Sequence, residues 1–279
     1  MMTVLSVCVP AYNSGRTLAT TLRSILDQDA DCEVVVLDNA SSDDTGEIAK
    51  STGDARVKVY RNEQTLPIGE NWNKAVWHAT GRLVKVVCAD DILLPGALGK
   101  QLEVMGDNGI AICSSKFQVI DESGGVEETD LGLPDLLGPR DARALMRVIV
   151  RRGPADFGPT AAALFRRADF DRVGGFRGDL VFPMDVDLFA RVSAFGLFYG
   201  LPDILAAWRN SSFNLCSSTS TVSKLTEMLR FHHRLGSEYP QLVGKSAVLA
   251  GDMRLARAAA DRVRIRAAAT ALRRPELLH

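Results

Sequence analysis

The chain has 279 residues, of which 46% are hydrophobic and 24% are charged, and its formal net charge is -1. This composition is typical of a globular protein and excludes an intrinsically disordered chain, while the near-zero charge gives no global reason to expect nucleic-acid binding. No stretch of the sequence approaches the roughly 18 uninterrupted apolar residues of a membrane-spanning helix.

Short apolar runs alternate with helix-like segments over the first ninety residues. We expect strands at Val4–Val9, Glu33–Leu37, Val57–Tyr60 and Leu83–Cys88, and helices at Thr17–Asp27, Thr45–Lys50 and Glu70–Thr80. Because the strands are continuous β-branched runs separated by helices, they indicate a parallel sheet buried on both faces. The order predicts a doubly wound α/β fold, whose ligands bind at the carboxyl ends of the strands.

Polar residues gather at three of these strand ends. They are Tyr12-Asn13 after the first strand, Asp38-Asn39 after the second and Asp90-Asp91 after the fourth. A doubly wound topology brings the three loops to one crevice, which is the predicted ligand site.

The pattern changes after Asp91. We expect a helix at Pro95–Met105, a strand at Ala111–Ile120, a surface loop or lid at Asp121–Gly138, a helix at Arg140–Arg151, a strand at Thr160–Phe165, a turn at Gly174-Gly175 and a helix at Asp185–Phe195. The remainder, after a Ser-rich stretch at Ser211–Ser223, is Ala/Arg/Leu-rich and helical in pattern.

The start of the chain and its cysteines predict a cytoplasmic protein. The start lacks a basic segment and a long apolar core, and Pro10 interrupts its short apolar run, so we expect no signal peptide. The five cysteines are scattered without C-x-x-C spacing, which is typical of a reduced protein.

No glycine-rich phosphate loop follows the first strand. Residues 10–15 contain neither G-x-G-x-x-G nor G-K-[ST], which disfavours a dinucleotide or P-loop site. A divalent cation held by carboxylates is another way to balance phosphate charge. Asp90-Asp91 is the best candidate, because adjacent carboxylates at a buried strand end repel each other without a cation or a proton. A helix cap beside a solvated carboxylate explains the pair equally well.

Asp38 opens a second polar cluster that continues to Asp44. Asp and Ser are common in turns and helix caps, so Ser42 or Asp43 is a candidate cap for the helix at Thr45. Asp38 differs because it directly follows the strand, where a carboxylate can accept hydrogen bonds from a base N–H or from ribose hydroxyls.

Five motifs resemble those of the family 2 glycosyltransferases, in the family's order and approximate spacing over residues 3 to 215. They are Pro10-Ala11-Tyr12-Asn13, Asp38–Thr45, Gly69–Ala75, Ala89–Leu93, and Gly174-Gly175-Phe176 followed by Asp185–Leu188 and Arg191. The resemblance implies a GT-A fold, Rossmann-like with a mostly parallel sheet, and an inverting transfer from a nucleotide-diphosphate sugar.

The resemblance also implies roles for single residues. The nucleotide would be bound by Pro10, Ala11, Tyr12, Asn13, Asp38, Asn71 and Asp90. A divalent metal, Mn²⁺ or Mg²⁺, would be held by Asp91 with Asp90, and Asp185 would be the general base. The sugar and acceptor would lie near Gly174, Gly175 and Trp208. Without the resemblance, Asp185 is typical of a helix N-cap, Asp187 with Arg191 is an ordinary i,i+4 pair, and Trp208 stays a candidate for stacking on a sugar.

Two positions depart from the family's pattern. Cys88 stands where many relatives have the first acid of an Asp-x-Asp motif, and Asn210 follows Trp208-Arg209 where many relatives have a metal-binding His. We therefore expect few protein ligands on the metal, with the donor diphosphate supplying most of the coordination.

The segment Arg254–Arg274 carries seven arginines against a single acid, Asp261. The simplest interpretation is a solvated helix, but scattered apolar residues (Leu255, Val263, Ile265 and Leu272) give it some amphipathic character. This predicts peripheral contact with an anionic membrane surface where a lipid-linked acceptor resides.

The sequence thus predicts a cytoplasmic, inverting glycosyltransferase with a glycan, glycolipid or small-molecule acceptor and no nucleic-acid partner. We expect a GT-A domain at 1–215, divided into a nucleotide-binding half (1–105) and an acceptor-binding half (106–215), and a helical extension at 216–279. One alternative is a catalytically silent nucleotide-sugar-binding or scaffold protein on the same fold. The other is a dinucleotide-dependent oxidoreductase, which the missing glycine fingerprint disfavours.

Overall fold

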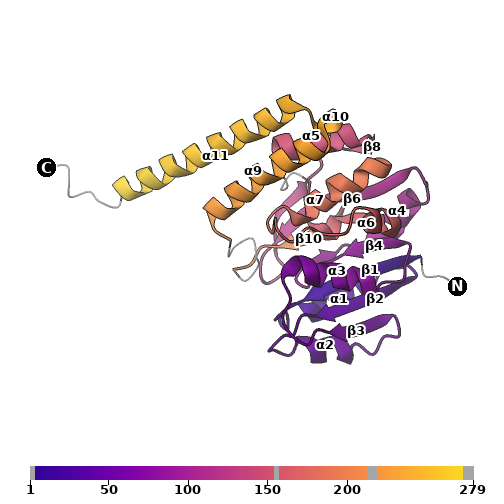
Figure 1. Cartoon of the computed structure of the whole chain (residues 1–279). Coiled ribbons are helices and arrows are strands. Elements are labelled where there is room, and N and C mark those ends of the chain that lie inside the picture. Colours follow the sequence, from indigo (N-terminus) through magenta and orange to yellow (C-terminus); the bar gives the residue numbers. More distant parts are fainter. Residues whose placement is uncertain (1–3, 154–156, 213–218, 273–279) are drawn as a thin grey trace.

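A single mixed sheet with helices on both faces organises the protein (Figure 1). The structure, a computed structural model, describes residues 4–153, 157–212 and 219–272. The strands are β1 Leu5–Ala11, β2 Cys32–Asp38, β3 Val57–Arg61, β4 Leu83–Val86, β5 Ile92–Leu93, β6 Ile110–Ile120, β7 Val126–Leu131, β8 Gly138–Arg140, β9 Ala163–Arg166 and β10 Leu197–Arg209. The α-helices are α1 Leu18–Leu26, α2 Thr45–Ser51, α3 Ile68–His78, α4 Ala97–Met105, α5 Ala142–Arg152, α6 Arg167–Arg172, α7 Met184–Val192, α9 Thr221–Glu238, α10 Pro240–Val243 and α11 Lys245–Leu272, and the 3-10 turns are η2 Thr160–Ala162 and η3 Ser193–Phe195.

The N-terminal half forms the parallel part of the sheet. β3, β2, β1 and β4 lie side by side and all pair in parallel. Every residue of β1 and β2 is buried, with Val34 and Val36 packed on one face and Val35 and Leu37 on the other. The predicted β-α-β order and the burial on both faces are therefore confirmed.

The C-terminal half makes the sheet mixed. The full order is β3-β2-β1-β4-β9-β6-β10-β5, in which β9 is antiparallel to β4 and β6 while β10 is parallel to β6 and antiparallel to β5. The predicted loop at Asp121–Gly138 is wrong, since it contains β7, which pairs with β6. The residues of β7 are mostly exposed and include Glu127, Glu128 and Asp130, as suits an edge strand. The segment therefore lacks the apolar pattern from which a strand is predicted.

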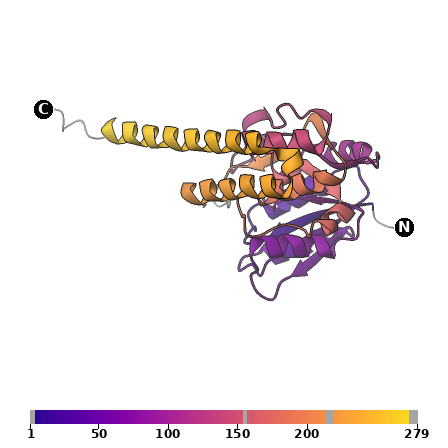
Figure 2. The same ribbon diagram turned by 45° about the horizontal axis from the view of Figure 1, so that its top comes forward.

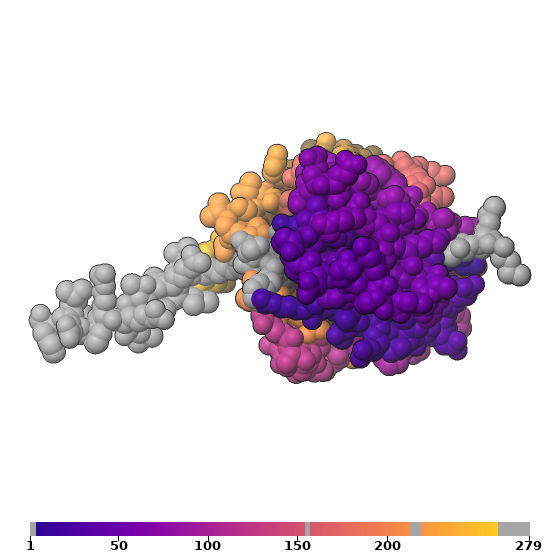
Figure 3. Space-filling model, turned by 90° about the horizontal axis from the view of Figure 1, so that it is seen from below, coloured from indigo at the N-terminus to yellow at the C-terminus, as the bar shows by residue number. Residues whose placement is uncertain are grey.

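The last helices pack on the same core as the central ones. Met228, Phe231 and Leu235 of α9 and Ala247 of α11 join the cluster that covers one face of the sheet. Beyond this contact α11 projects from the body with α9 beside it (Figures 1 and 2). Viewed from below, the N-terminal half forms most of the visible surface, and α9 stands at its edge (Figure 3). The proposed boundary at residues 215 and 216 stays a prediction.

The backbone of the predicted basic segment is described as far as Leu272, in α11, but its side chains only as far as Asp261. Arg273 and Arg274 fall outside the described residues, and of the seven arginine side chains only those of Arg254 and Arg257 are described. Among the helices of the described ranges, none is both long and apolar enough to span a membrane.

A buried ion pair holds the turn at Gly174-Gly175. Arg191 and Asp187 are both 1% exposed, and Arg191 Nε donates to Asp187 Oδ2 at 2.8 Å. The same guanidinium donates to the carbonyls of Val173 (3.0 Å) and Gly175 (2.9 Å). The predicted i,i+4 pair is therefore confirmed, but it is buried and also holds the turn that ends α6.

Left-handed backbone explains the two glycines of this turn. Gly174 and Gly175 have φ of 76° and 75°, a region that favours glycine. A Cβ on Gly175 would lie 2.4 Å from Oδ1 of Asn73, which accepts a hydrogen bond from the Phe176 N–H at 2.7 Å. No described atom lies within 4 Å of a Cβ placed on Gly174, so the turn presents this residue to open space.

We expect Asp187→Ala to lower the free energy of unfolding by about 3–5 kcal/mol, because it leaves the Arg191 guanidinium buried and unpaired. The matched control is Asp171→Ala, since Asp171 forms another i,i+4 pair with Arg167 but is half-exposed (side-chain exposure 50%). That change should cost about 0–1 kcal/mol. Urea unfolding of both variants measures the difference, and equal losses would contradict the account of a buried ion pair.

Candidate active site

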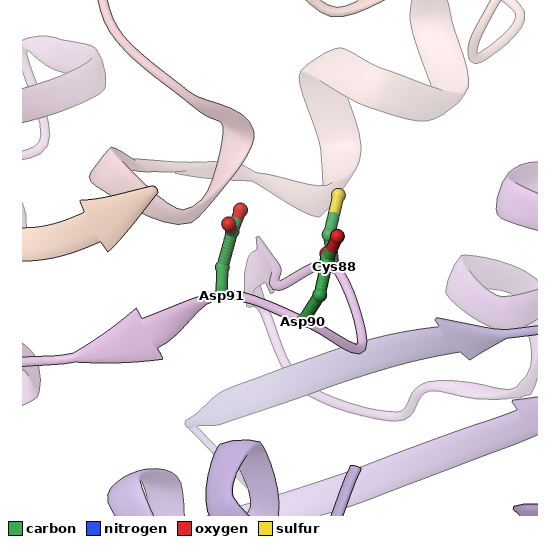
Figure 4. Close-up of side chains that lie close together, drawn as sticks. All are labelled: Cys88, Asp90 and Asp91. Atoms are coloured by element: carbon green, nitrogen blue, oxygen red, sulfur yellow. The ribbon is translucent and has the colours of Figure 1, made fainter. Parts of the chain in front are cut away.

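The loop between β4 and β5 places three potential ligands on one side. The side chains of Cys88, Asp90 and Asp91 point the same way (Figure 4), and one ligand atom from each lies within 4.8 Å of the other two. A turn closed by the Asp91 N–H on the Cys88 carbonyl (3.0 Å) brings them together. The strand-end loop predicted from the sequence is thus a compact cluster of acids beside a thiol.

Helix α1 holds this loop from behind. The Thr21 hydroxyl donates to the carbonyls of Ala89 (3.1 Å) and Asp91 (2.8 Å), and the Thr17 hydroxyl donates to Ala89 at 2.8 Å. Thr17 is the N-cap residue of α1 but its side chain makes no capping bond. Its hydroxyl is thus used to position the loop.

Arg209, at the end of β10, holds the loop from the other side. Its Nε donates to the Asp90 carbonyl at 2.9 Å, and its backbone N–H donates to Asp91 Oδ1 at 3.1 Å. Its Nη1 donates to the carbonyls of Asp121 (2.9 Å) and Glu122 (3.0 Å). This buried guanidinium therefore joins the loop after β4 to the turn between β6 and β7, a role that the sequence did not predict although Trp208-Arg209 belongs to the resemblance.

Burial governs the ionisation of the acid pair. Asp91 is 2% exposed, and burial, followed by the negative charge of Asp90, holds the pKa of its carboxyl well above the ordinary range. Burial also raises the pKa of Asp90, against the lowering effect of Arg209. Neither aspartate caps α4, whose N-cap residue is Gly96, so the capping alternative is wrong.

The donor atoms fit a hard divalent cation in part. Carboxylate oxygens are the ligands that Mg²⁺ and Mn²⁺ prefer, and a cation would remove the repulsion that raises these two pKa values. The Cys88 sulfur is a soft ligand that these ions do not favour. The residues present therefore fit a site with two carboxylate ligands, Asp90 and Asp91.

Asp185 lies in the first turn of α7, and its negative charge is the last of the effects that raise the pKa of Asp91. Burial raises the pKa of Asp185 itself to about 6, although solvent still reaches part of its side chain. The N-cap residue of α7 is Pro183, so the interpretation of Asp185 as the cap is wrong.

Asp38 lies at the predicted strand end but is already bonded. Its carboxylate pairs with Arg61 and accepts the Ser41 N–H at 2.9 Å. Ser41 in turn accepts the Asn13 N–H at 2.9 Å, which joins the loops after β1 and β2 as predicted. A cavity of about 320 Å³ lies on the outer side, between α2 and β3, and is lined in part by Asp38, Lys50 and Arg61.

The remaining predicted nucleotide-binding residues differ in their burial and in their hydrogen bonds. Pro10 and Ala11 are buried at the end of β1, whereas Tyr12 is 53% exposed. Asn71 is buried and accepts a hydrogen bond from Asn62 Nδ2 at 2.9 Å, so it supports the segment after β3.

Trp208 lies in β10, where it is partly buried and packs against the hydrophobic core, and its stacking on a sugar stays a prediction.

Comparison with known proteins agrees with this arrangement. A family model described as Glycosyl transferase family 2 matches residues 6–174. The chain is 31% identical over 223 residues to an uncharacterized protein of Mycobacterium tuberculosis, covering 75% of this chain and 68% of that one. It is 29% identical over 121 residues to the UDP-Glc:alpha-D-GlcNAc-diphosphoundecaprenol beta-1,3-glucosyltransferase WfgD of Escherichia coli. That match covers 43% of this chain and 48% of the relative, so the chain spans about half the length of that enzyme.

Two solved structures share the fold. One is Staphylococcus aureus TarS 1-349 in complex with UDP-GlcNAc, with a TM-score of 0.65 and 20% identity, covering 84% of this chain and 66% of that one. The other is a mannosyltransferase from Pyrobaculum calidifontis in complex with GDP-Man and Mn²⁺, with a TM-score of 0.60 and 19% identity, covering 98% of this chain and 81% of that one. At these identities the likeness concerns the fold, and it confirms the predicted GT-A architecture.

We expect Asp91→Asn to stabilise the protein at pH 7.5 in the presence of EDTA. A carboxyl whose folded-state pKa is raised contributes stability below its unfolded value, near 3.9, and loses it as the pH rises through the folded value. Asparagine keeps the acceptor for the Arg209 N–H but carries no charge. The melting temperature should rise by about 2–4 °C for each kcal/mol gained, and the gain should vanish near pH 4.

Differential scanning fluorimetry measures this, with Asp29→Asn as the control because Asp29 is exposed. A wild-type protein as stable as Asp91→Asn at pH 7.5 would show that burial of this charge carries no cost.

Proposed function

Because the chain belongs to glycosyl transferase family 2, we propose that it is an inverting glycosyltransferase moving a sugar from a nucleotide-diphosphate donor to an acceptor hydroxyl. The observation that carries the proposal is the compact cluster of Cys88, Asp90 and Asp91 in the loop after β4, where α7 brings the charge of Asp185 near enough to raise the pKa of Asp91. The family membership excludes the oxidoreductase alternative.

Asp185 is the proposed general base. With a pKa raised to about 6, it is ionised at neutral pH yet basic enough to accept a proton, which is the useful range for a base. The acceptor oxygen would attack the anomeric carbon from the face opposite the diphosphate and lose its proton to Asp185. The new glycosidic bond forms as the bond to the diphosphate oxygen breaks, so the configuration inverts.

Asp90 and Asp91 are the proposed ligands of a divalent metal. A bound Mn²⁺ or Mg²⁺ would supply charge stabilisation for the departing nucleoside diphosphate. The raised pKa values support this, since the two carboxyls are poorly matched to a site without a cation. The fold shared with a mannosyltransferase in complex with GDP-Man and Mn²⁺ supports it too.

The nucleotide would lie on the loops after β1 and β2. Tyr12 is the best placed to meet a base, because its ring is exposed. Asp38 would contact the nucleotide only after the Arg61 side chain moves, since the guanidinium forms an ion pair with the Asp38 carboxylate. Gly174 would present open backbone to the sugar, and Gly175 would hold the turn.

The proposed acceptor is a glycan, glycolipid or small-molecule hydroxyl, with a lipid-linked acceptor favoured. The E. coli relative carries a diphosphoundecaprenol acceptor in its name, and the projecting α11 begins the basic segment predicted to meet anionic lipid. A cytoplasmic, membrane-peripheral location follows from this proposal and from the cysteine pattern.

We expect the protein to float with vesicles containing anionic lipid and not with purely zwitterionic vesicles. Binding should weaken as salt rises, since each Lys or Arg near the surface contributes about 1 kcal/mol of screened attraction. Flotation equal on both vesicle types, or absent from both, would remove the membrane contact from the proposal.

Two substitutions should separate binding from turnover. We expect Asp185→Asn to lower nucleotide release by at least about a hundredfold while keeping Mn²⁺-dependent stabilisation by UDP or GDP. Asp91→Asn should lose that stabilisation. Thermal shift and nucleotide-release assays measure both, and an active Asp185→Asn enzyme would remove the base assignment. A wild-type protein that binds donor but never releases nucleotide would favour the scaffold alternative.

A further inference from the structure

We propose that Thr160 is a positioning residue for the transfer step, holding the Asp185 carboxylate, and that the buried pair Lys85–Gln101 holds the turn that carries Thr160. The inference rests on the proposed function, because that function gives Asp185 the role of base.

The carboxylate of Asp185 is held from two elements. Thr160 Oγ1, in η2, donates to Asp185 Oδ2 at 3.2 Å, and the Val186 N–H, in α7, donates to Oδ1 at 2.7 Å. Thr160 is 4% exposed, so water does not readily replace its hydroxyl. One donor on each oxygen fixes the plane of the carboxylate, and a base is effective only within hydrogen-bond reach of the proton that it takes.

The turn carrying Thr160 is in turn held by side chains from elsewhere. Gln101 Nε2, in α4, donates to the Ala162 carbonyl at 2.7 Å. Lys85 Nζ, in β4, donates to the Ala163 carbonyl at 3.2 Å and to Gln101 Oε1 at 2.8 Å. These carbonyls stand where η2 passes into β9, and buried carbonyls without a donor are costly.

Stability alone does not explain a lysine at position 85. Its side chain is 1% exposed, both of these acceptors are neutral oxygens, and burial lowers the pKa of its ammonium to about 7. An apolar residue would fill the same volume without the desolvation cost. What the lysine adds is a bond between β4 and the start of β9.

That bond connects the two parts of the proposed site. β4 leads directly into the loop of Asp90 and Asp91, whereas η2 carries the hydroxyl on Asp185. The Lys85–Gln101 pair therefore relates the position of the base to that of the acid pair, through buried hydrogen bonds that join β4, α4 and the turn at η2.

A control exists at the opposite end of the sheet. The Thr80 hydroxyl donates to Glu33 Oε1 at 2.8 Å, which is also a threonine–carboxylate bond, although Thr80 is exposed and the Ser6 hydroxyl donates to the same oxygen. Thr80 precedes β4, far along the strand from the acid loop. Valine at either position removes the hydroxyl and keeps the shape, so the pair distinguishes a local loss of stability from a loss of positioning.

The experiment uses the full chain with Mn²⁺ and three donors: UDP-glucose, UDP-N-acetylglucosamine and GDP-mannose. Nucleotide release is followed with water as the acceptor, so no glycan acceptor has to be known. We expect Thr160→Val to lower kcat by about ten- to a hundredfold while leaving the donor KM within about twofold. Thr160→Ser should restore kcat to within about threefold, and Thr80→Val should leave kcat unchanged.

A second measurement needs no turnover. Thr160→Val should lower the melting temperature of the wild-type protein by more than it lowers that of Asp185→Ala, because only the former loses the hydrogen bond. Equal losses in the two backgrounds would overturn the proposal, and so would a serine variant no more active than the valine variant.

The outcomes also separate this inference from the proposed function. If Asp185→Asn is inactive while Thr160→Val turns over donor as the wild type does, the positioning role fails and the base assignment stands. If Asp185→Asn keeps full turnover, the base assignment fails, and with it the role in the transfer step.

Discussion

The concentration of negative charge at one end of the sheet is the constraint on which the rest of the structure depends. Asp90, Asp91 and Asp185 come from two distant segments and lie where burial raises the pKa of each carboxyl. Such a cluster opposes folding unless cations or hydrogen-bond donors stand near it. The hydroxyls of Thr17 and Thr21 and the Arg209 guanidinium bind the loop's carbonyls, and the side chains of Asp90 and Asp91 point the same way (Figure 4).

The mixed, C-terminal half of the sheet supplies the side chains that complete this site. A purely parallel sheet would end at β4 with the acid loop unsupported on one side. β10 runs beside β6 and ends on Arg209, and the reversal of β9 brings η2 against β4. The mixed half of the sheet thus supplies both the guanidinium that holds the acid loop, at the end of β10, and the hydroxyl that holds Asp185, just before β9.

The local pattern of apolar residues was sufficient to predict the strands of the N-terminal half, but not those of the C-terminal half. The strands that become β1 to β4 are short runs of apolar residues buried on both faces, so their sequence alone marks them, and the acids at their ends follow. β10 carries Gly200, Pro202 and Asp203 and shifts register repeatedly against β6, which erases the alternation that marks a strand. Its position depends on pairing with residues some ninety places away, and no local signal encodes that.

The same reasoning explains which site residues could be found. Asp90 and Asp91 stand out because adjacent carboxylates at the end of a buried strand are conspicuous. Asp185 was found through the resemblance alone, since an acid at the start of a helix is otherwise typical of an N-cap. Thr160 lies in a run of small residues, and nothing in the sequence couples it to an acid 25 positions later.

Asp38 was predicted at the right strand end, but its partner Arg61 was not, because an ion pair between adjacent strands depends on the register of β2 and β3.

Cys88 bears on how this site would hold a cation. With a thiol in place of a third acid, this cluster has two carboxylates. Both have raised pKa values, so protons compete with a lone metal ion for them as the pH falls. The diphosphate of a donor would add hard oxygens and bring charge of its own. If it completes the coordination, donor and metal raise each other's affinity by the same factor, since coupling between two ligands is reciprocal. The acid pair would then act as half of a site whose other half arrives with the substrate.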